Sequence, residues 1–340
     1  MIITRTPVRV SFGGGGTDIP GFYEEHGGAV VSITINKYFY SFYNPREDEK
    51  IQMISSDFQS LLSVDDFYSL KFGEGFDIHS AVIKHFRLYH GFDLFTASEI
   101  PPGSGLGSSG AVTVNMVRLC SKLKNETMTQ RQIAEDAYFI QREILNLPIG
   151  KQDEYAAAYG GLNLIEFSDK DVSVTPIQIK PDVKKCLEKN LFLFFTKKTR
   201  QASTILQRQE DSIKEKDNSV IKAMIEVKNN AYQIKEALEE GDLKRFGGLL
   251  DEAWDSKKKM SPGITNDYLD RIYKIAIQSG ALGGKIAGAG GGGYFMFYCE
   301  EDKQDNLRDA MEAEKLGFLD FNFTEKGVTI LNNGNAMQLN

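Results

Sequence analysis

Three clusters of glycine constrain how this chain can fold. They lie at residues 13–16, at 101–110 in a glycine–serine stretch, and at 283–293. Glycine loses more backbone entropy on ordering than any other residue, so such clusters are costly within regular structure. They are tolerated where the chain turns sharply or where another group approaches the backbone closely. Each cluster is therefore expected to form a loop beside a strand or helix. Taken alone, the third cluster fits a β-bulge or a tight chain crossing as well as it fits a loop that another group approaches closely.

The segments between these loops carry the patterns of strands and helices. Strands are expected where β-branched and aromatic residues gather, at residues 2–12, 29–43, 50–55, 92–98, 162–167, 191–196 and 294–299. Helices are expected at 77–90, after the second glycine cluster, behind a capping box of Thr129 and Gln132, and in an amphipathic series over 201–279. A strand-rich beginning followed by helices and late strands indicates an α+β protein rather than a doubly wound sheet.

The length of the chain favours two domains. A chain of 340 residues is long for a single small core. The polar segment 168–190 is the best candidate for a junction. We therefore expect one domain over residues 1–180 and a second over residues 181–340.

Charge and composition argue against several classes of function. The net charge of −7 argues against general binding to nucleic acid or to an anionic membrane. The three cysteines have no spacing typical of a zinc site, and they fit a reducing compartment. No apolar run approaches the roughly 20 residues of a membrane span, and the first residues do not resemble a signal peptide. We expect a cytoplasmic protein with no nucleic-acid or membrane partner. Whether it forms a homodimer is left open.

The second glycine cluster, PPGSGLGSSG at 101–110, has the composition of a phosphate-binding loop. It joins an expected strand to an expected helix, so it presents unpaired N–H groups and the positive end of the helix dipole. Ser104, Ser108 and Ser109 add hydroxyls, one of which can bind Mg²⁺. Its G-x-G-x-x-G pattern is weak evidence, because the pattern recurs at 288–293 and lies far from a first βα turn. No Walker A motif is present, and a Ser-capped helix after a flexible turn is the alternative.

Three segments together resemble the three signature motifs of the GHMP family of sugar and metabolite kinases. In chain order they are TPVRVSFGGGGTD at 6–18, PPGSGLGSSGAV at 101–112 and GGKIAGAGGGGYFMF at 283–297. GKQDEYAAAYGG at 150–161 and TRQASTIL at 199–206 are similar to the branch that phosphorylates C1 of D-glycero-D-manno-heptose 7-phosphate. The resemblance implies a two-domain GHMP kinase fold, with an N-terminal domain like ribosomal protein S5 domain 2 and a C-terminal ferredoxin-like domain. The active site is then expected in the cleft between them.

The resemblance implies that the second glycine cluster wraps the triphosphate of ATP. Nucleotide contacts are then expected from Gly103, Ser104, Gly105, Gly107, Ser108 and Ser109. Ser108 is similar to the serine that coordinates Mg²⁺ in the family, and Glu143 is the expected carboxylate ligand. The sequence departs from the family pattern at Gln141, where relatives carry a glutamate. Arg142 or a lysine is the alternative partner of Glu143. Residues 52–57 are a candidate lining for the adenine pocket.

The expected catalytic residues are Asp153, Arg9 and Lys151. By resemblance, Asp153 matches the aspartate that faces the acceptor hydroxyl and can take its proton. The alternative is an N-cap or a salt-bridged acid. Arg9 is expected near the acceptor oxygen or the γ-phosphate, and Lys151 is expected beside Asp153, where it would stabilise the transferring charge. A surface position is the alternative for both cations.

The first glycine cluster is assigned to the acceptor. Its short side chains let a sugar ring lie against the backbone, and the carboxylate of Asp18 suits hydroxyls and repels phosphate. Acceptor contacts are expected from Gly14, Gly15, Gly16, Thr17, Asp18, Arg200, Gly290 and Gly291. Arg200 is chosen for a phosphate carried by the sugar because a guanidinium binds phosphate bidentately. The run Lys257–Lys259 is more typical of a solvated helix face.

These features predict a kinase that uses ATP and Mg²⁺ to phosphorylate the anomeric hydroxyl of a sugar or sugar phosphate. By resemblance, heptose 7-phosphate is the leading acceptor. A neutral-sugar 1-kinase of the fucokinase or galactokinase type is one alternative. The other is a non-catalytic regulator that binds nucleotide or sugar. Gln141 keeps the regulator open, whereas Asp153, Ser108 and two of the glycine clusters argue against it.

Overall fold

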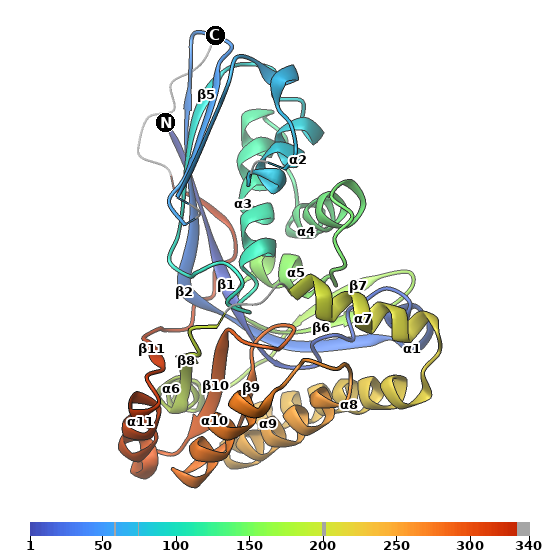
Figure 1. The fold of residues 1–340 in the computed structure, drawn as a ribbon, viewed down its shortest axis with the longest axis vertical. Coiled ribbons are helices and arrows are strands. Elements are labelled where there is room, and N and C mark those ends of the chain that lie inside the picture. Colours follow the sequence, from blue (N-terminus) through green and yellow to red (C-terminus); the bar gives the residue numbers. More distant parts are fainter. Residues whose placement is uncertain (58, 74, 199–201, 332–340) are drawn as a thin grey trace.

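The computed structural model describes residues 1–57, 59–73, 75–198 and 202–331. Within these ranges the strands form two sheets, one of eight strands and one of four. In Figure 1 the larger sheet and its helices occupy the upper part of the molecule, and the smaller sheet lies below them with long helices beside it. We call these the large sheet and the small sheet.

The large sheet is built mostly from the first half of the chain. Its strands are β1 (Ile2–Gly13), β2 (Gly28–Pro45), β3 (Ile51–Ser55), β4 (Ser60–Val64), β5 (Phe92–Ser98), β6 (Leu162–Phe167), β7 (Val172–Pro176) and β12 (Thr329–Leu331). The order is β12-β1-β2-β5-β3-β4, and β6 pairs with both β2 and β7. The long strand β2 is shared, because its first residues pair with β6 and its last residues pair with β5.

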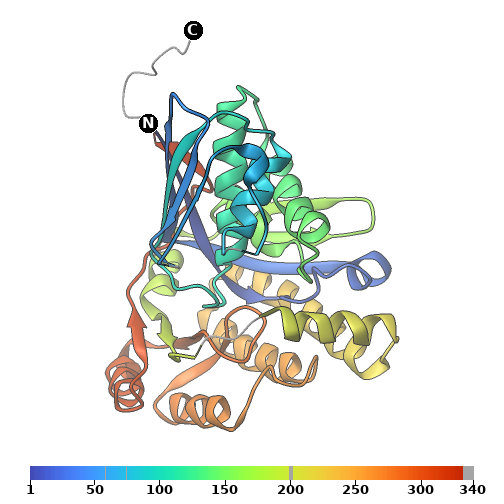
Figure 2. The same cartoon turned by 45° about the horizontal axis from the view of Figure 1, so that its top comes forward.

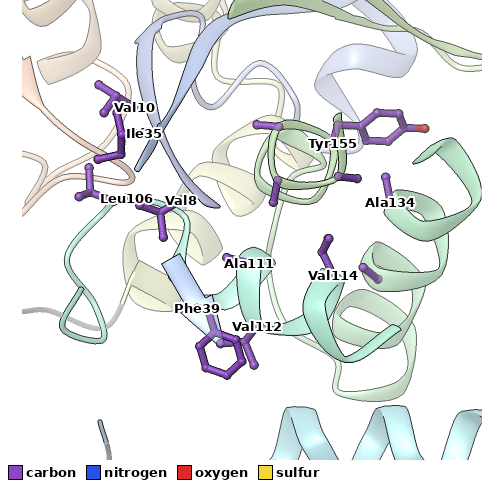
Figure 3. Packing of buried hydrophobic residues seen from close by; sticks show 14 of the residues in the cluster. Val8, Val10, Ile35, Phe39, Leu106, Ala111, Val112, Val114, Ala134 and Tyr155 are labelled. Atoms are coloured by element: carbon purple, nitrogen blue, oxygen red, sulfur yellow. The ribbon is translucent and has the colours of Figure 1, made fainter. Parts of the chain in front are cut away.

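Four helices of the first half of the chain form a layer beside the large sheet. They are α2 (Asp77–His85), α3 (Ser108–Leu123), α4 (Gln130–Phe139) and α5 (Gln152–Tyr159). In this layer α3 and α5 contact the strands, and the other two pack on these helices. The capping box predicted at Thr129 and Gln132 is confirmed at the start of α4. Figure 3 shows apolar side chains of β1 and β2 close to those at the start of α3, and Tyr155 of α5 beside Ala134 of α4. These residues are buried, so the core of this part lies between the sheet and the helices.

The small sheet belongs to the second half of the chain and has the order β11-β8-β10-β9. Its strands are β8 (Leu191–Phe195), β9 (Ala281–Ile286), β10 (Tyr294–Cys299) and β11 (Gly317–Leu319). Its helices are α6 (Pro181–Asn190), α7 (Ala202–Lys214), α8 (Asn218–Glu240), α9 (Leu243–Lys258), α10 (Asp267–Gln278) and α11 (Gln304–Ala313). The short helix α1 (Phe22–His26) follows the first glycine cluster. Short 3₁₀ turns lie at Phe67–Ser69 and Glu301–Lys303.

The two parts are joined along the first two strands. In Figures 1 and 2 the last part of β1 and the first part of β2 run between the upper helices and α8, and α8 contacts both strands. The chain passes from the large sheet to the small sheet between β7 and α6, and β12 later returns to pair with β1. The ends of β1 and of the loops around it therefore lie where the two parts meet.

The predicted α+β architecture is confirmed. Among the described strands, β3 and β5 form the single parallel pair, and the other pairs are antiparallel. A doubly wound sheet would be mainly parallel. Across the described residues, no helix combines the length and the apolar character needed to cross a bilayer.

Candidate active site

The three glycine clusters come together at one cavity. Its volume is about 170 Å³. From the clusters it is lined by Gly15, Gly16, Gly103, Ser104, Gly105, Gly107, Ser108, Ser109, Gly110, Gly288 and Ala289. Backbone hydrogen bonds fix this meeting, since the N–H of Arg9 donates to Leu106 O at 3.0 Å and the N–H of Tyr294 donates to Ser104 O at 3.0 Å. Loops that are far apart in the sequence therefore enclose a single site, which we call the central cavity.

The loop before α3 is arranged to bind an anion. Gly103, Gly105 and Gly107 have φ angles of +70°, +83° and +77°, which side chains rarely adopt. No side chain caps the first turn of α3, and no acidic residue lies in that turn. Its N–H groups and the positive end of the helix dipole are therefore available to a ligand. This supports the phosphate-binding role predicted for the second glycine cluster.

The third glycine cluster packs backbone to backbone against that loop. A Cβ atom on Gly105 would lie 2.3 Å from Ala287 O, and one on Gly293 would lie 2.3 Å from Ser104 O. Gly290 and Gly291 were expected to contact the acceptor, but they face the chain near Ile264 instead, and neither lines the central cavity. The tight chain crossing that the sequence left open therefore accounts for these two glycines.

Arg9 and Asp153 form an ion pair in the central cavity. Arg9 Nε donates to Asp153 Oδ1 at 2.8 Å, and Nη2 lies 2.5 Å from the same oxygen. Arg9 Nη1 also donates to Gly105 O at 2.7 Å, which ties the pair to the anion-binding loop. Among the described residues, Asp153 Oδ2 has no hydrogen-bond partner, and the side chain is 30% exposed. Both residues stand where the sequence predicted catalytic groups, and one carboxylate oxygen is free to accept a proton.

Asp18 binds two segments of backbone together. Oδ1 accepts from the N–H of Gly16 at 2.9 Å, and Oδ2 accepts from the N–H of Gln152, the first residue of α5, at 3.0 Å. The side chain is buried, and burial raises the pKa of Asp18 above its usual value. Asp18, Gly15 and Gly16 line the central cavity, so each can still contact an acceptor there.

Gly14 and Thr17 lie outside the cavity lining, although both were expected to contact the acceptor. The hydroxyl of Thr17 donates to Gly14 O at 2.8 Å and accepts from the N–H of Ala29 at 3.1 Å. A Cβ atom on Gly14 would lie 1.8 Å from Ala29 O. These two residues therefore hold the loop against the start of β2.

A hydrogen-bonded row of side chains runs from α3 to α5. The hydroxyl of Ser109 donates to Gln141 Oε1, and Gln141 Nε2 donates to Glu154 Oε1 at 2.5 Å. Gln141 lies in a π-turn, Ile140–Ile144, of the kind that often marks functional sites. Glu154 is 2% exposed, and its Oε2 has no hydrogen-bond partner in the described structure. Burial and the neighbouring Asp153 raise the pKa of Glu154 well above its usual value.

Comparison with known proteins decides the family. The model of the GHMP kinase N-terminal domain matches residues 77–161, and that of the C-terminal domain matches residues 234–316. A D-glycero-alpha-D-manno-heptose 7-phosphate kinase of Campylobacter jejuni is 37% identical over 333 residues, covering 96% of this chain and 98% of that protein. The chain belongs to the GHMP kinase family. The resemblance inferred from the three glycine clusters is thereby confirmed.

Two solved structures extend this likeness to the fold. The crystal structure of a D-glycero-D-manno-heptose 1-phosphate kinase from Bacteroides thetaiotaomicron aligns with a TM-score of 0.83 at 27% identity, covering 98% of this chain and 100% of that one. A putative sugar kinase from Campylobacter jejuni aligns with a TM-score of 0.78 at 35% identity, covering 97% and 98%. The two-domain GHMP kinase fold expected from the sequence is confirmed over nearly the whole chain.

Two further residues predicted for the site of this GHMP kinase do not line the central cavity, and a third is not described by the structure. The ammonium of Lys151 lies 3.1 Å from Glu135 and over the ring of Tyr138, away from the central cavity. Glu143 is exposed and does not line that cavity. Residues two apart on a helix face different sides, so Lys151 turns away from Asp153, as Glu143 turns away from Gln141. Arg200 lies outside the described residues.

The lining of the central cavity also includes Lys257 and Gln209, neither of which was assigned to the site from the sequence. Lys257 is buried on α9, its ammonium donates to Gly288 O, and burial lowers the pKa of Lys257 to about 8. Gln209 of α7 is 2% exposed, and its Oε1 has no hydrogen-bond partner among the described residues. A signal for Lys257 was present, because it continues the helical spacing of the buried residues Phe246, Leu250 and Ala253.

A second, larger cavity adjoins the central one. Its volume is about 640 Å³, and it shares Gly103, Ser108 and Ser109 with the central cavity. Its apolar lining is Phe72, Ile78, Ile100, Pro102, Val112, Ile144, Leu145 and Leu147. Of the predicted adenine segment 52–57, only Asp57 lines it. We call it the apolar cavity. In a GHMP kinase it offers a place for a flat, weakly polar group beside the anion-binding loop.

Proposed function

We propose that this GHMP kinase transfers the γ-phosphoryl group of ATP to the anomeric hydroxyl of D-glycero-D-manno-heptose 7-phosphate. The observation that carries the proposal is the layout of the two cavities. The apolar cavity and the central cavity meet at Gly103, Ser108 and Ser109, and Asp153 stands on the central side of that junction. The choice of acceptor is supported by the 37% identity to a heptose 7-phosphate kinase over nearly the whole chain.

The nucleotide spans the junction. We place its base in the apolar cavity, where aliphatic and aromatic side chains replace water around a flat ring. The phosphates then lie over the glycines of the loop and reach the uncapped N-terminus of α3. The γ-phosphate is directed into the central cavity, towards Arg9 and Asp153.

The chemical step takes place in the central cavity. The acceptor oxygen bonds to the γ-phosphorus, the bond from that phosphorus to the β–γ bridging oxygen breaks, and ADP leaves. The proton of the acceptor hydroxyl passes to Asp153, whose Oδ2 is free while Arg9 holds Oδ1. Arg9 and Lys257 bring positive charge to the oxygens that become more negative during transfer.

The acceptor occupies the end of the central cavity nearest the first glycine cluster. Gly15 and Gly16 leave room for a ring against the backbone, and Asp18 accepts hydrogen bonds from its hydroxyls. Gln209 adds an unpartnered carbonyl oxygen at the same cavity. Arg200 stays the proposed partner of the sugar phosphate, and Lys257 is a described cation in the lining of the same cavity.

Mg²⁺ is proposed as the cation that accompanies ATP. Oxygen donors suit it, and Ser108 and Glu154 both line the central cavity, so the residues present fit a hard divalent cation. When bound, the ion neutralises charge on the β- and γ-phosphate oxygens. The protein then has only to position the acceptor and receive its proton.

The test is a panel of acceptors with ATP and MgCl₂. With heptose 7-phosphate as acceptor, the amount of ADP released is expected to equal the amount of a new anomeric phosphate, which ³¹P NMR detects. Its kcat/KM is expected to exceed that of the free heptose, galactose and fucose by at least about 100-fold, the value of a charged contact near 3 kcal/mol. Comparable turnover of a neutral sugar would instead identify a neutral-sugar 1-kinase. Saturable nucleotide binding with no turnover of any acceptor would identify a regulator.

A further inference from the structure

Glu154 is an unusual group to bury at this place. Only 2% of its surface is exposed, one oxygen is bonded to the neutral amide of Gln141, and Oε2 has no partner among the described residues. Asp153, the adjacent residue, is also a carboxylate, and its positive partner Arg9 is bonded to Asp153. A buried carboxylate without a cation is strongly disfavoured. A positive group supplied from outside the chain would relieve this.

The surroundings of Glu154 identify the kind of cation. It lines the central cavity together with Ser104 and Ser108, so the donors present there are carboxylate and hydroxyl oxygens. Such oxygens suit Mg²⁺, which typically takes one or two carboxylates and completes its shell with substrate phosphates and water. The described residues contain no group of three or more His, Cys, Asp or Glu able to hold a metal. The cation must therefore depend on the phosphates of a nucleotide.

Glu143, the carboxylate expected from the sequence, is in the wrong place for this role. It is exposed and does not line the central cavity, whereas Gln141 from the same π-turn does. Gln141 is an amide, and its partner across the 2.5 Å hydrogen bond is the acid Glu154. This pair therefore holds a single carboxylate, that of Glu154.

We propose that Glu154 is the carboxylate ligand of the divalent cation that binds with ATP, and that the amide of Gln141 orients it. The proposal rests on the proposed function only in that a nucleotide must bind. Ser109, which donates to Gln141 Oε1, fixes which way the amide points, so that its N–H faces Glu154 Oε1 and leaves Oε2 for the cation.

The test measures metal binding and does not require turnover. Mn²⁺ is titrated into the protein with the non-hydrolysable analogue AMP-PNP, and free Mn²⁺ is followed by its EPR signal. Loss of a group that only orients a ligand typically costs about 10–100-fold in metal affinity, so E154Q, which removes the ligand itself, is expected to cost at least about 100-fold. E143Q, which removes the rival carboxylate, is expected to bind Mn²⁺ as the unchanged protein does.

An exchange of the two side chains sharpens the test. Q141E/E154Q puts the carboxylate on the π-turn and the amide on α5, with the hydrogen bond kept, and is expected to restore Mn²⁺ affinity to within about tenfold of the unchanged protein. Folding is checked by thermal unfolding without ligands, where E154Q should lose nothing because glutamine has the same shape and no buried charge. AMP-PNP with Mn²⁺ should then raise the unfolding temperature of the unchanged protein and not that of E154Q.

Unchanged Mn²⁺ affinity in E154Q, or its loss in E143Q, would overturn the proposal. So would an E154Q defect that the exchanged pair does not repair. These outcomes are separate from those of the acceptor panel. A protein that phosphorylates heptose 7-phosphate with the same Mn²⁺ affinity in E154Q refutes Glu154 alone, and one that binds Mn²⁺ through Glu154 but phosphorylates no sugar refutes the function alone.

Discussion

Replacement of Gly105 by alanine tests whether backbone contact with the third glycine cluster holds the second cluster in place. Gly105 has a φ angle of +83°, and a Cβ atom there would lie 2.3 Å from Ala287 O and 2.9 Å from the Ala287 carbonyl carbon. Both are backbone atoms, so neither can rotate away as the end of a side chain would. The anion-binding loop and the backbone at Ala287 must move apart to accept the methyl group.

Two costs of this substitution add. A left-handed backbone conformation costs an L-residue about 1–2 kcal/mol. Forcing an extra methyl group into a close-packed site costs a further 1–3 kcal/mol or so. The free energy of unfolding of G105A should therefore fall by about 2–5 kcal/mol. A displacement of about 1 Å at the phosphates should also lower kcat by about 100-fold.

Two other glycines separate these costs. Gly73 has a φ angle of +95° with no described atom within 4 Å of a Cβ, so G73A should show the conformational cost alone. Gly248 lies inside α9 with ordinary backbone angles and the same open space, so G248A should gain about 0.5–1 kcal/mol from helix propensity. Neither substitution should change nucleotide binding.

The measurements are urea unfolding, the Kd of AMP-PNP by calorimetry, and kcat by ADP release. G105A should lose more stability than G73A and should be the only one of the three to bind nucleotide more weakly. If G105A matches G73A in stability and matches the unchanged protein in nucleotide affinity, backbone contact with the third cluster does not hold the loop.

Three further substitutions test individual side chains. D153N should lower kcat by about 10²–10⁴-fold in the ADP-release assay, with AMP-PNP affinity nearly unchanged, because it removes the proposed base; turnover within tenfold would argue against that role. D18A leaves the N–H groups of Gly16 and Gln152 without an acceptor, so urea unfolding should show a loss of about 2–5 kcal/mol, and KM should rise for the sugar more than for ATP. Burial lowers the pKa of Lys257 to about 8 in the folded protein. Between about pH 8 and 10 the Lys257 side chain therefore carries a proton in the unfolded chain that it lacks in the folded chain. The free energy of unfolding should then rise with pH in this range, by up to about 1.4 kcal/mol per pH unit. In K257M the free energy of unfolding, measured with urea at pH 7–9.5, should rise less steeply with pH. An unchanged dependence on pH would show that the ammonium is not buried.

Strands were predictable because their signal is local. Residues 92–98, 162–167 and 294–299 were predicted as strands and form β5, β6 and β10 with the same bounds, since each is a short run of β-branched and aromatic residues between turn residues. Helix α5 was missed. It is short, follows Pro148 and Gly150, and buries six of its eight residues, so no polar face marks a helical period.

Helix ends and exposure were harder. The helix expected over 77–90 ends at His85, and Tyr89, beyond that end, is 51% exposed. The apolar residue Ile144 is 37% exposed and lines the apolar cavity. An apolar side chain that waits for a ligand has the same sequence pattern as one that packs in a core.

The residues of the candidate site also divide into those with a local sequence signal and those without one. The meeting of the second glycine cluster, Arg9 and Asp153 at one cavity was predictable because each lies in a segment whose own sequence is distinctive. Lys151 and Glu143 were misplaced because the direction of a side chain on a short helix depends on one-residue details of its start. Gln209 and Glu154 were not identified from the sequence. Each is notable because it is buried with an oxygen that has no hydrogen-bond partner among the described residues, and this depends on the tertiary structure.

The second and third glycine clusters look alike in sequence and have different structural roles. The second needs glycine for left-handed turns beneath a ligand, whereas the third needs it so that its backbone can lie against the second. The third cluster belongs to the β9–β10 connection of the small sheet, and the loop it touches precedes α3 on the large sheet. The anion-binding loop is therefore shaped by both halves of the molecule. Lys257 also donates to Gly288 O, and Gly288 lies against the backbone of Gly105, so α9 is tied to the anion-binding loop through the third cluster.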